Sequence, residues 1–518
     1  GANFNNQFGI GSNVPANGSP ISIDALEQIS INVTPYDVRQ TGFTGGSINA
    51  VTRSGTNKFF GSAFYTMRGE ENQGKRIEDY RIPQSAIQRL DEKNYGFSLG
   101  GPIIKDKLFF FVNGEWKKTI SPGTNKIAST PGQPFQSIST VARPTADFLN
   151  GVKSYLMSTY GYDPGVYQGY VNEASNNKLF ARLDWNISDN HRFSVRYNQV
   201  ESLTPSSLSS SATGSGLSPS SANNRTSINA LHFSNSNYYT AANLYSGVAE
   251  LNSSFGSKFT NTLRATYSHQ NDPRTSDGDI FPLVDIMDGP SVLTTFGYEP
   301  FTYGNLRDVE TYTYSDDLGI ALGKHNLTIG AQAEFSTTKN GFQRFGTGYY
   351  VFNSWNDFVT GAKPSNYAIT YSLNADGSQA FPSFKFAQYS AYIQDEFTVS
   401  DRLKLTAGLR VEQPSYPDVS EIKTHQLVLD QTFANGEKIN TGALPETRLA
   451  FSPRFGFNWD VKGDRSFQVR GGTGIFTGRI PFVWLVSQSG DAGLLQYTQA
   501  YNGQANTPGV FTPDINAY

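Results

Sequence analysis

The chain has 518 residues, of which 50 are glycine and none is cysteine, and only 16% are charged. Without cysteine, disulfides, thiol nucleophiles and thiolate metal ligands are excluded. A formal net charge of −3 gives no electrostatic footprint for nucleic acid, so we expect no nucleic-acid partner. The 28 tyrosines and 37 phenylalanines are numerous, and no run of about 20 apolar residues predicts a transmembrane helix.

The first part of the chain differs from the rest. Two short strand-like pieces, residues 21–33 (ISIDALEQISINV) and 45–53 (GGSINAVTR), lie in glycine- and asparagine-rich chain together with a brief helical patch. A turn at residues 54–58 follows. We interpret residues 1–57 as a small mixed α/β element that precedes a different domain, residues 58–518.

From residue 59 onward, about 13 segments of alternating hydrophobicity follow one another, and after the first one short polar links and long Gly/Ser/Asn-rich loops alternate strictly. The segments are residues 59–68, 94–102, 107–117, 178–187, 192–200, 243–253, 259–269, 312–321, 327–338, 388–399, 403–412, 451–460 and 467–479. Strands of roughly 9–11 residues with short turns on one side and long loops on the other are typical of a transmembrane β-barrel.

Within these segments the period is two, and the two faces differ in chemistry. In residues 178–187, Leu179, Leu183 and Trp185 share one face, and Lys178 and Arg182 share the other. The apolar face suits lipid, and charges of both signs are acceptable in a water-filled or plugged lumen. A half-buried antiparallel sheet of a soluble protein has the same alternation. The asymmetry of the loops favours the barrel.

Three sequence blocks carry a specific resemblance. Residues 24–33 (DALEQISINV), 45–65 (GGSINAVTRSGTNKFFGSAFY) and 94–116 (NYGFSLGGPIIKDKLFFFVNGEW) closely resemble the end of the plug and the first barrel strands of TonB-dependent receptors, especially the Oar-like group that carries a carboxypeptidase-regulatory domain. Residues 452–485 resemble a mid-barrel hairpin of the same group. The resemblance implies an all-β transmembrane antiparallel barrel of 22 strands, preceded by the C-terminal part of an α/β plug.

The resemblance also implies a location and partners. These are the outer membrane of a Gram-negative bacterium with its lipid, an extracellular ligand, and the TonB complex, which engages a box upstream of this sequence. The chain opens at Gly1 without a signal peptide and closes in a proline-containing loop, FTPDINAY. We therefore expect it to be a fragment of a longer receptor that takes up an iron chelate, a peptide or an oligosaccharide.

Charged residues in the predicted lumen suggest contacts between plug and barrel. Arg39 and Arg53 lie in the predicted plug, and the barrel carboxylates expected to face inward are Glu115, Glu250, Glu334 and Glu396. Ion pairs between the two sets would fix a plug yet remain breakable under force. The alternative is that all six are ordinary solvated lumen charges.

Aromatic side chains gather in two of the long loops, residues 296–303 and 346–355. Tyr298, Tyr303, Tyr349, Tyr350 and Trp355 are either a stacking surface for a ligand or part of the interfacial girdle of the barrel. In contrast, the low-complexity stretch at residues 206–221 (SSLSSSATGSGLSPSS) predicts a mobile loop.

No catalytic or cofactor site is indicated. The five histidines have no metal-binding spacing, and the GxSxG match at residues 96–100 lies inside a predicted strand rather than at a strand-to-helix turn. We therefore predict no enzyme and no cofactor. Besides the transporter, an Oar-like component for adhesion or protein export and a soluble β-rich binding module remain open.

Overall fold

A computed structural model describes residues 3–11, 14, 16–33, 36–42, 46–82, 89–217 and 219–518. Its main feature is one antiparallel sheet of 13 strands, with β3 and β23 at its two edges. The strands in sheet order are β3 (Phe60–Gly69), β6 (Asp91–Ile104), β7 (Leu108–Pro122), β10 (Val171–Ser188), β11 (His191–Ser206), β12 (Tyr238–Phe255), β13 (Phe259–Thr275), β16 (Leu306–Leu322), β17 (His325–Gly341), β20 (Ser383–Ser400), β21 (Leu403–Asp418), β22 (Ala450–Asp460) and β23 (Gln468–Gly474).

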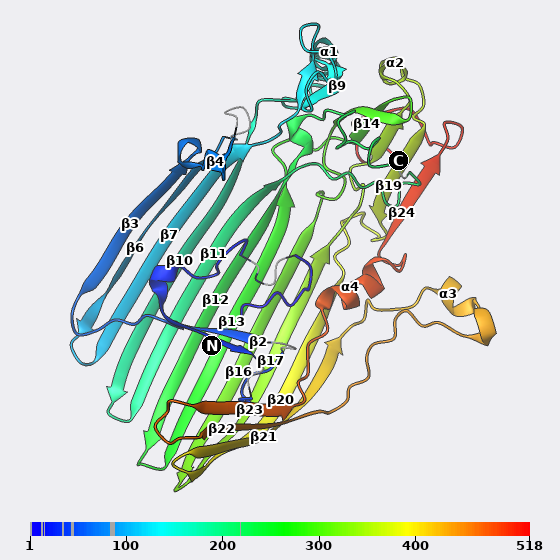
Figure 1. Cartoon of the computed structure of the whole chain (residues 1–518). Helices are drawn as coiled ribbons and strands as arrows, with labels where there is room; N and C mark the ends of the chain where they lie inside the picture. The colour runs from blue at the N-terminus through cyan, green and yellow to red at the C-terminus, as the bar shows by residue number, and fades with distance from the viewer. Residues whose placement is uncertain are drawn as a thin grey trace.

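The number of strands and the alternation of links agree with the sequence prediction. Short turns join β6 to β7 and β10 to β11 at one end of the strands, and the long connections leave from the opposite end, as Figure 1 shows. The fold class, a mostly antiparallel strand structure of the outer-membrane barrel type, is therefore confirmed, with the sheet open between β3 and β23.

The strands are longer than predicted. The sequence indicated residues 178–187 for β10, which instead runs from Val171 to Ser188, and β12 and β20 also have 18 residues each. A strand that crosses the hydrocarbon core needs only about 9–11 residues. In β10 the added residues 171–177 (VNEASNN) are polar on both faces, so the two-residue period is lost while the hydrogen-bonded ladder continues. The polar stretch at residues 171–177 therefore lengthens β10 beyond the segment whose alternation predicts contact with lipid.

The two faces of the sheet separate as the alternation predicts. Leu179, Leu183 and Trp185 are exposed on the outer face, each with more than two fifths of its surface accessible, whereas Lys178 and Phe180 on the other face are buried. Exposed apolar side chains in this regular pattern are suited to contact with lipid. Among the described residues, no helix is long and apolar enough to cross a bilayer.

The described residues between 3 and 53, which we call the N-terminal segment, lie against the polar face of this sheet (Figure 1). It contains the short helix η1 (Ile23–Ala25) and a separate two-stranded sheet of β1 (Leu26–Val33) and β2 (Gly46–Thr52). Phe111 and Phe180 of the large sheet pack on Ile21 and Ala25 of the segment. The strand-like pieces and the helical patch of the sequence analysis are thus present.

Long loops pack together into a second folded unit, which we call the cap, at the strand ends opposite the short turns (Figure 1). Its core is a five-stranded sheet in the order β15, β14, β18, β19, β24, in which β14 and β18 are parallel. The elements of the cap are β8 (Ile127–Ser129), β9 (Val141–Thr145), α1 (Ala146–Tyr160), β14 (Leu283–Asp288), β15 (Ser291–Phe296), β18 (Tyr349–Phe352), α2 (Trp355–Val359), β19 (Asn366–Ser372) and β24 (Gln496–Asn502).

The cap has a hydrophobic core of its own. Leu149, Val152 and Leu156 form the buried stripe of α1, whose N-cap Thr145 accepts a hydrogen bond from the Phe148 amide at 3.2 Å. Apolar residues of β14, β15, β18, α2 and β19 complete this core: Val284, Ile286, Phe296, Tyr350, Phe352, Phe358 and Ile369. The loops are therefore packed against each other rather than independent.

Two other predictions need correction. The stretch at residues 206–221, expected to be mobile, packs Leu208 and Ala212 into a buried cluster with Phe345 and Tyr349. The last predicted strand, residues 467–479, ends at Gly474; Arg479 beyond it pairs with Glu334 of β17, and Pro481 precedes helix α4 (Phe482–Gly490). The remaining elements are η2 (Glu70–Asn72), β4 (Arg76–Ile77), β5 (Tyr80–Arg81), η4 (Ser234–Ser236), α3 (Gln426–Asp430) and η5 (Ala434–Gly436).

Candidate functional site

Acidic side chains on the polar face of the large sheet are paired mainly with basic groups of the same sheet. Glu115 Oε1 lies 2.8 Å from Lys178 Nζ on the neighbouring strand, and Glu250 Oε2 lies 2.7 Å from Arg264 Nε. These two carboxylates face inward, as the alternation predicts, but their charges are compensated by barrel residues. Glu396 is exposed and accepts a long hydrogen bond of 3.4 Å from Gln394 Nε2.

Glu334 is also inward and buried, and its partner comes from far along the chain. Arg479, in the segment after β23, makes a bidentate ion pair with it, with Nη1 to Oε1 at 2.8 Å and Nη2 to Oε2 at 2.9 Å. The Nη2–Oε2 contact is a charge-assisted hydrogen bond, and the close approach of Nη1 to Oε1 adds to the attraction between the two charges. This pair therefore anchors the chain between β23 and α4 to the wall at β17.

The two arginines predicted to bridge from the N-terminal segment do not reach these carboxylates. Arg39 pairs with Asp37 two residues away, at 2.6 Å, and this pairing raises the pKa of the Arg39 guanidinium. Arg53 Nε donates to the carbonyl oxygen of Leu26 at 3.1 Å. Both arginines are satisfied within the segment. The predicted ion pairs between the segment and the barrel are therefore not formed, because Arg39 pairs with Asp37 and Arg53 donates to a carbonyl oxygen of the segment itself.

The segment is held instead through its backbone. Side-chain donors of the barrel wall each bind one of its carbonyl oxygens, as follows: Asn176 to Ala16 at 2.8 Å, Arg182 to Thr52 at 2.9 Å, Asn198 to Pro20 at 3.1 Å, Arg307 to Ile10 at 2.6 Å, Arg410 to Val38 at 3.1 Å and Arg454 to Asp37 at 2.5 Å. Hydrogen bonds to charged groups contribute about 1.5–3 kcal/mol each. Because these contacts are separate along the chain, they can break one at a time.

Residues 36–42 lie at the densest part of this interface. Arg410 is fully buried, its Nε donates to Glu412 at 2.8 Å, its Nη2 donates to Gln332 at 3.0 Å, and its guanidinium stacks 4.9 Å from the Tyr392 ring centroid. The amide of Val38 donates to Gln394 Oε1 at 3.1 Å. The hydroxyl of Thr41 donates to Glu412 as well. Four barrel side chains from three strands, β20, β21 and β22, therefore bind this short piece of chain directly: Gln394, Arg410, Glu412 and Arg454.

Sequence reasoning missed this arrangement for a physical reason. It located inward-facing charges correctly, but it matched charge with charge, and a backbone carbonyl has no signature in the sequence. The available signal was the excess of inward arginines and asparagines on β10, β11, β21 and β22, which carry more donors than the inward carboxylates accept.

The five aromatic residues proposed as ligand contacts lie in or beside the cap. Tyr349 and Tyr350 are buried, each about 2% exposed, and contribute to its interior. Trp355 is partly buried and its ring lies 5.4 Å from Tyr155 and 5.3 Å from Phe358. Tyr298 and Tyr303 are partly exposed. Tyr349 and Tyr350 thus support the fold of the cap, and its partly exposed aromatics are the ones available to a ligand.

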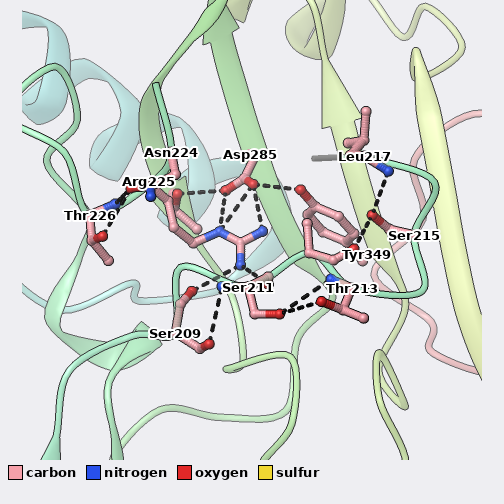
Figure 2. Close-up of polar contacts among 12 residues, drawn as sticks. Ser209, Ser211, Thr213, Ser215, Leu217, Asn224, Arg225, Thr226, Asp285 and Tyr349 are labelled. Carbon is pink, nitrogen blue, oxygen red and sulfur yellow. Dashed lines mark hydrogen bonds and ion pairs between the residues drawn. The ribbon is translucent and has the colours of Figure 1, made fainter. Parts of the chain in front are cut away.

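A buried ion pair stabilises the interior of the cap (Figure 2). Arg225 donates to Asp285 through Nε at 3.1 Å and Nη2 at 2.8 Å, and its Nη1 donates to the carbonyl oxygens of Ser209 and Ser211 at 3.0 and 2.9 Å. Asp285 also accepts the hydroxyls of Thr295 at 2.6 Å and Tyr349 at 2.7 Å. Ser209, Ser211 and Arg225 of the loop between β11 and β12 are thereby tied to β14, β15 and β18.

Two basic side chains of the cap, His232 and Lys126, have lowered pKa values. Burial and the nearby Lys126 charge lower the pKa of His232 to about 4, and burial lowers the pKa of Lys126 to about 8. Lys126 Nζ donates to the carbonyl oxygens of Thr226, Ser227 and Ala230, at 2.8, 2.6 and 3.1 Å. Both groups lie at the join between the chain after β7 and the loop before β12. Their contacts are structural, and they position the cap.

Comparisons with known proteins agree with this architecture. The family model of the outer membrane beta barrel domain matches residues 51–516. TonB-dependent transporter Oar from Myxococcus xanthus is 40% identical over 112 residues, which are 20% of this chain and 10% of that protein. The outer membrane transporter YddB from Escherichia coli superposes with a TM-score of 0.59 at 13% identity, covering 93% of this chain and 52% of that one. The siderophore receptor PirA from Acinetobacter baumannii gives a TM-score of 0.45 at 16% identity, covering 87% and 48%.

The local match to TonB-dependent transporter Oar agrees with the resemblance to the Oar-like group. The chain spans about half the length of the solved structures that it matches, and its match to the curated relative covers a tenth of that protein.

Proposed function

Because the chain belongs to the outer membrane β-barrel family and therefore lies in the outer membrane of a Gram-negative bacterium, we propose that it is part of a TonB-dependent receptor for energy-coupled uptake of a bulky ligand. In this proposal residues 1–57 are the C-terminal part of the plug, and residues 58–518 are barrel wall and extracellular loops. Membership in this family rules out the soluble β-rich binding module.

One observation carries the proposal. A separate segment with its own small sheet occupies the polar face of the barrel wall and is held there by bonds from wall side chains to its backbone. A permanent structural core would be sealed by apolar packing. Here apolar contacts around Phe8, Ala16 and Ile21 are combined with polar, directional contacts that can separate one by one, which suits a plug that must be moved by a pulling force and then return.

The cap defines the ligand side. The cap lies at the strand ends from which the long loops leave. Because its loops share a buried core, they hold one another in a fixed shape and do not behave as independent loops. A preformed surface binds with less loss of conformational entropy than mobile loops do. Iron chelates, peptides and oligosaccharides remain the ligand classes of the proposal, with Tyr298, Tyr303 and Trp355 as its candidate contacts. The partners are outer-membrane lipid and the TonB complex.

The test uses cells that express the full-length receptor or lack it. Three labelled probes are supplied separately: a ferric catecholate chelate, a mixed oligopeptide pool and a mixed oligosaccharide pool. We expect one probe to accumulate only in expressing cells, and we expect a protonophore or loss of TonB to abolish this accumulation. Equal accumulation of all three probes in both strains would contradict active uptake.

A second candidate function is an outer-membrane component for adhesion or protein export. The observation that favours it is the cap, since a folded unit with its own core offers a protein-sized surface. It predicts no accumulation of any probe, together with loss of a surface or secreted protein from cells without the receptor. Comparison of the culture supernatant and the cell-surface proteins of the two strains distinguishes it from uptake.

A further inference from the structure

Helix α4 lies between the N-terminal segment and the cap and contacts both. On one side, the amides of Phe482 and Val483 in its first turn donate to the carbonyl oxygens of Gln7 and Phe8, at 3.1 and 3.0 Å. The first turn of a helix has amides without intrahelical acceptors. The N-terminal segment supplies the acceptors that this helix requires.

The side chain of Phe8 strengthens this contact. It is 1% exposed and occupies an apolar socket, whose buried members are Val309, Phe384, Phe386, Ile422, Phe482, Leu485 and Val486. The Phe482 ring meets Phe384 edge-on, with centroids 5.2 Å apart and planes at 89°. The helix that closes the socket is thus fixed both by the wall and by the residue it encloses.

On its other side, α4 leads directly into the cap. Five residues after its end, the chain enters β24, which pairs with β19 along seven residues, from Asn366 with Asn502 to Ser372 with Gln496. Gln496 Nε2 donates to the carbonyl oxygen of Phe342 at 2.8 Å, and Arg344 pairs with Asp491 at 3.4 Å. The five residues between helix and sheet are held at both ends, at Asp491 and Gln496, so a displacement of the helix is expected to pull on β24.

We propose that α4 couples the N-terminal segment to the extracellular cap, so that release of Phe8 from its socket loosens β24 and, reciprocally, a change in the cap alters the hold on Phe8. The Arg479–Glu334 pair fixes the incoming end of the helix, so the outgoing end, toward β24, is the one free to move. Coupling between two sites acts equally in both directions. The proposal goes beyond ligand uptake and does not depend on the identity of the ligand.

The first arm of the test is hydrogen exchange on the full-length protein in detergent, followed by mass spectrometry of peptides from α4 and β24. Phe8→Ala is expected to speed exchange at least tenfold in residues 482–490 and in residues 496–502. The matched control is Phe4→Ala, which removes another aromatic ring of the same segment from a different cluster, near Ile21. We expect the control to leave β24 unchanged.

The second arm works from the cap. The hydroxyls of Thr370 and Thr498 face each other across β19 and β24 at 2.7 Å, and the chain has no cysteine, so Thr370→Cys with Thr498→Cys introduces one defined disulfide. Oxidation is expected to slow exchange at the Phe482 and Val483 amides at least threefold relative to the reduced form of the same protein. This arm decides the question if Phe8→Ala fails to fold, and Phe8→Leu then replaces it in the first arm.

Three results would overturn the coupling. If Phe8→Ala speeds exchange in α4 but not in β24, motion ends at the helix. If Phe4→Ala loosens β24 as much as Phe8→Ala does, the effect is general destabilisation. Identical exchange at Phe482 and Val483 in the oxidised and reduced forms would remove the reciprocal half and, with it, the proposal.

Discussion

Replacement of Arg410 by methionine tests whether wall side chains hold the N-terminal segment through its backbone. The substitution keeps a long apolar stem but removes the bonds to Val38, Glu412 and Gln332. The charge-assisted bond to the Val38 carbonyl contributes about 1.5–3 kcal/mol, equivalent to about 10- to 150-fold in the equilibrium for local opening. We expect hydrogen exchange in residues 36–42 to rise by that factor.

Global stability will fall as well, because Glu412 is left buried without its cation. Loss of one partner of a buried pair costs about 3–5 kcal/mol. The double variant Arg410→Met with Glu412→Gln removes that unpaired charge. It is expected to recover much of the resistance to urea while residues 36–42 still exchange fast, which separates the local hold from overall stability.

Arg182→Met is the matched control, since Arg182 binds the carbonyl oxygen of Thr52 at 2.9 Å and also pairs with Asp184 in the same strand. It is expected to speed exchange in residues 46–53 and to leave residues 36–42 unchanged. Unchanged exchange in residues 36–42 of the Arg410 variant would refute the reasoning, and so would acceleration of both regions by either substitution.

Three more predictions concern the cap and the segment after β23. Arg225→Met leaves the buried Asp285 carboxylate without its cation and should destabilise the cap by about 3–5 kcal/mol. We expect rapid proteolysis of the cap loops, while the heat-modifiable band of the barrel on a gel persists. Burial lowers the pKa of His232 to about 4, so below about pH 6.5 the unfolded cap binds more protons than the folded cap. The free energy of unfolding of the cap should therefore fall by roughly 3 kcal/mol between pH 6.5 and about pH 4. A His232→Asn variant should lack this part of the pH dependence in urea titrations followed by hydrogen exchange. Glu334→Gln removes the charge that anchors Arg479 and should speed exchange in residues 475–481 by at least fivefold, whereas Glu396→Gln, at an exposed site, should have no effect there.

The sequence determined the barrel wall. The period of two, the alternation of short links with long loops and the aromatic composition predict 13 strands and the orientation of their faces, because each of these signals is local. Lys178 and Leu179 illustrate this, since adjacent residues of a strand must point to opposite sides whatever the rest of the chain does. The pattern did not predict the full length of β10, because residues 171–177 are polar on both faces and show no alternation.

Only the tertiary structure decided how distant parts of the chain meet. Arg479 and Glu334 are 145 residues apart in sequence, and the contact of Arg410 with Val38 spans 372 residues. Local periodicity carries no information on such pairings, and a carbonyl acceptor looks the same at every residue. The cap shows the same limit: the sequence around Tyr349 predicts an exposed aromatic in a loop, whereas residues of the β11–β12 and β13–β16 loops bury it. The sequence thus fixes which face each wall residue takes, and the long-range packing of loops and N-terminal segment decides what that residue touches.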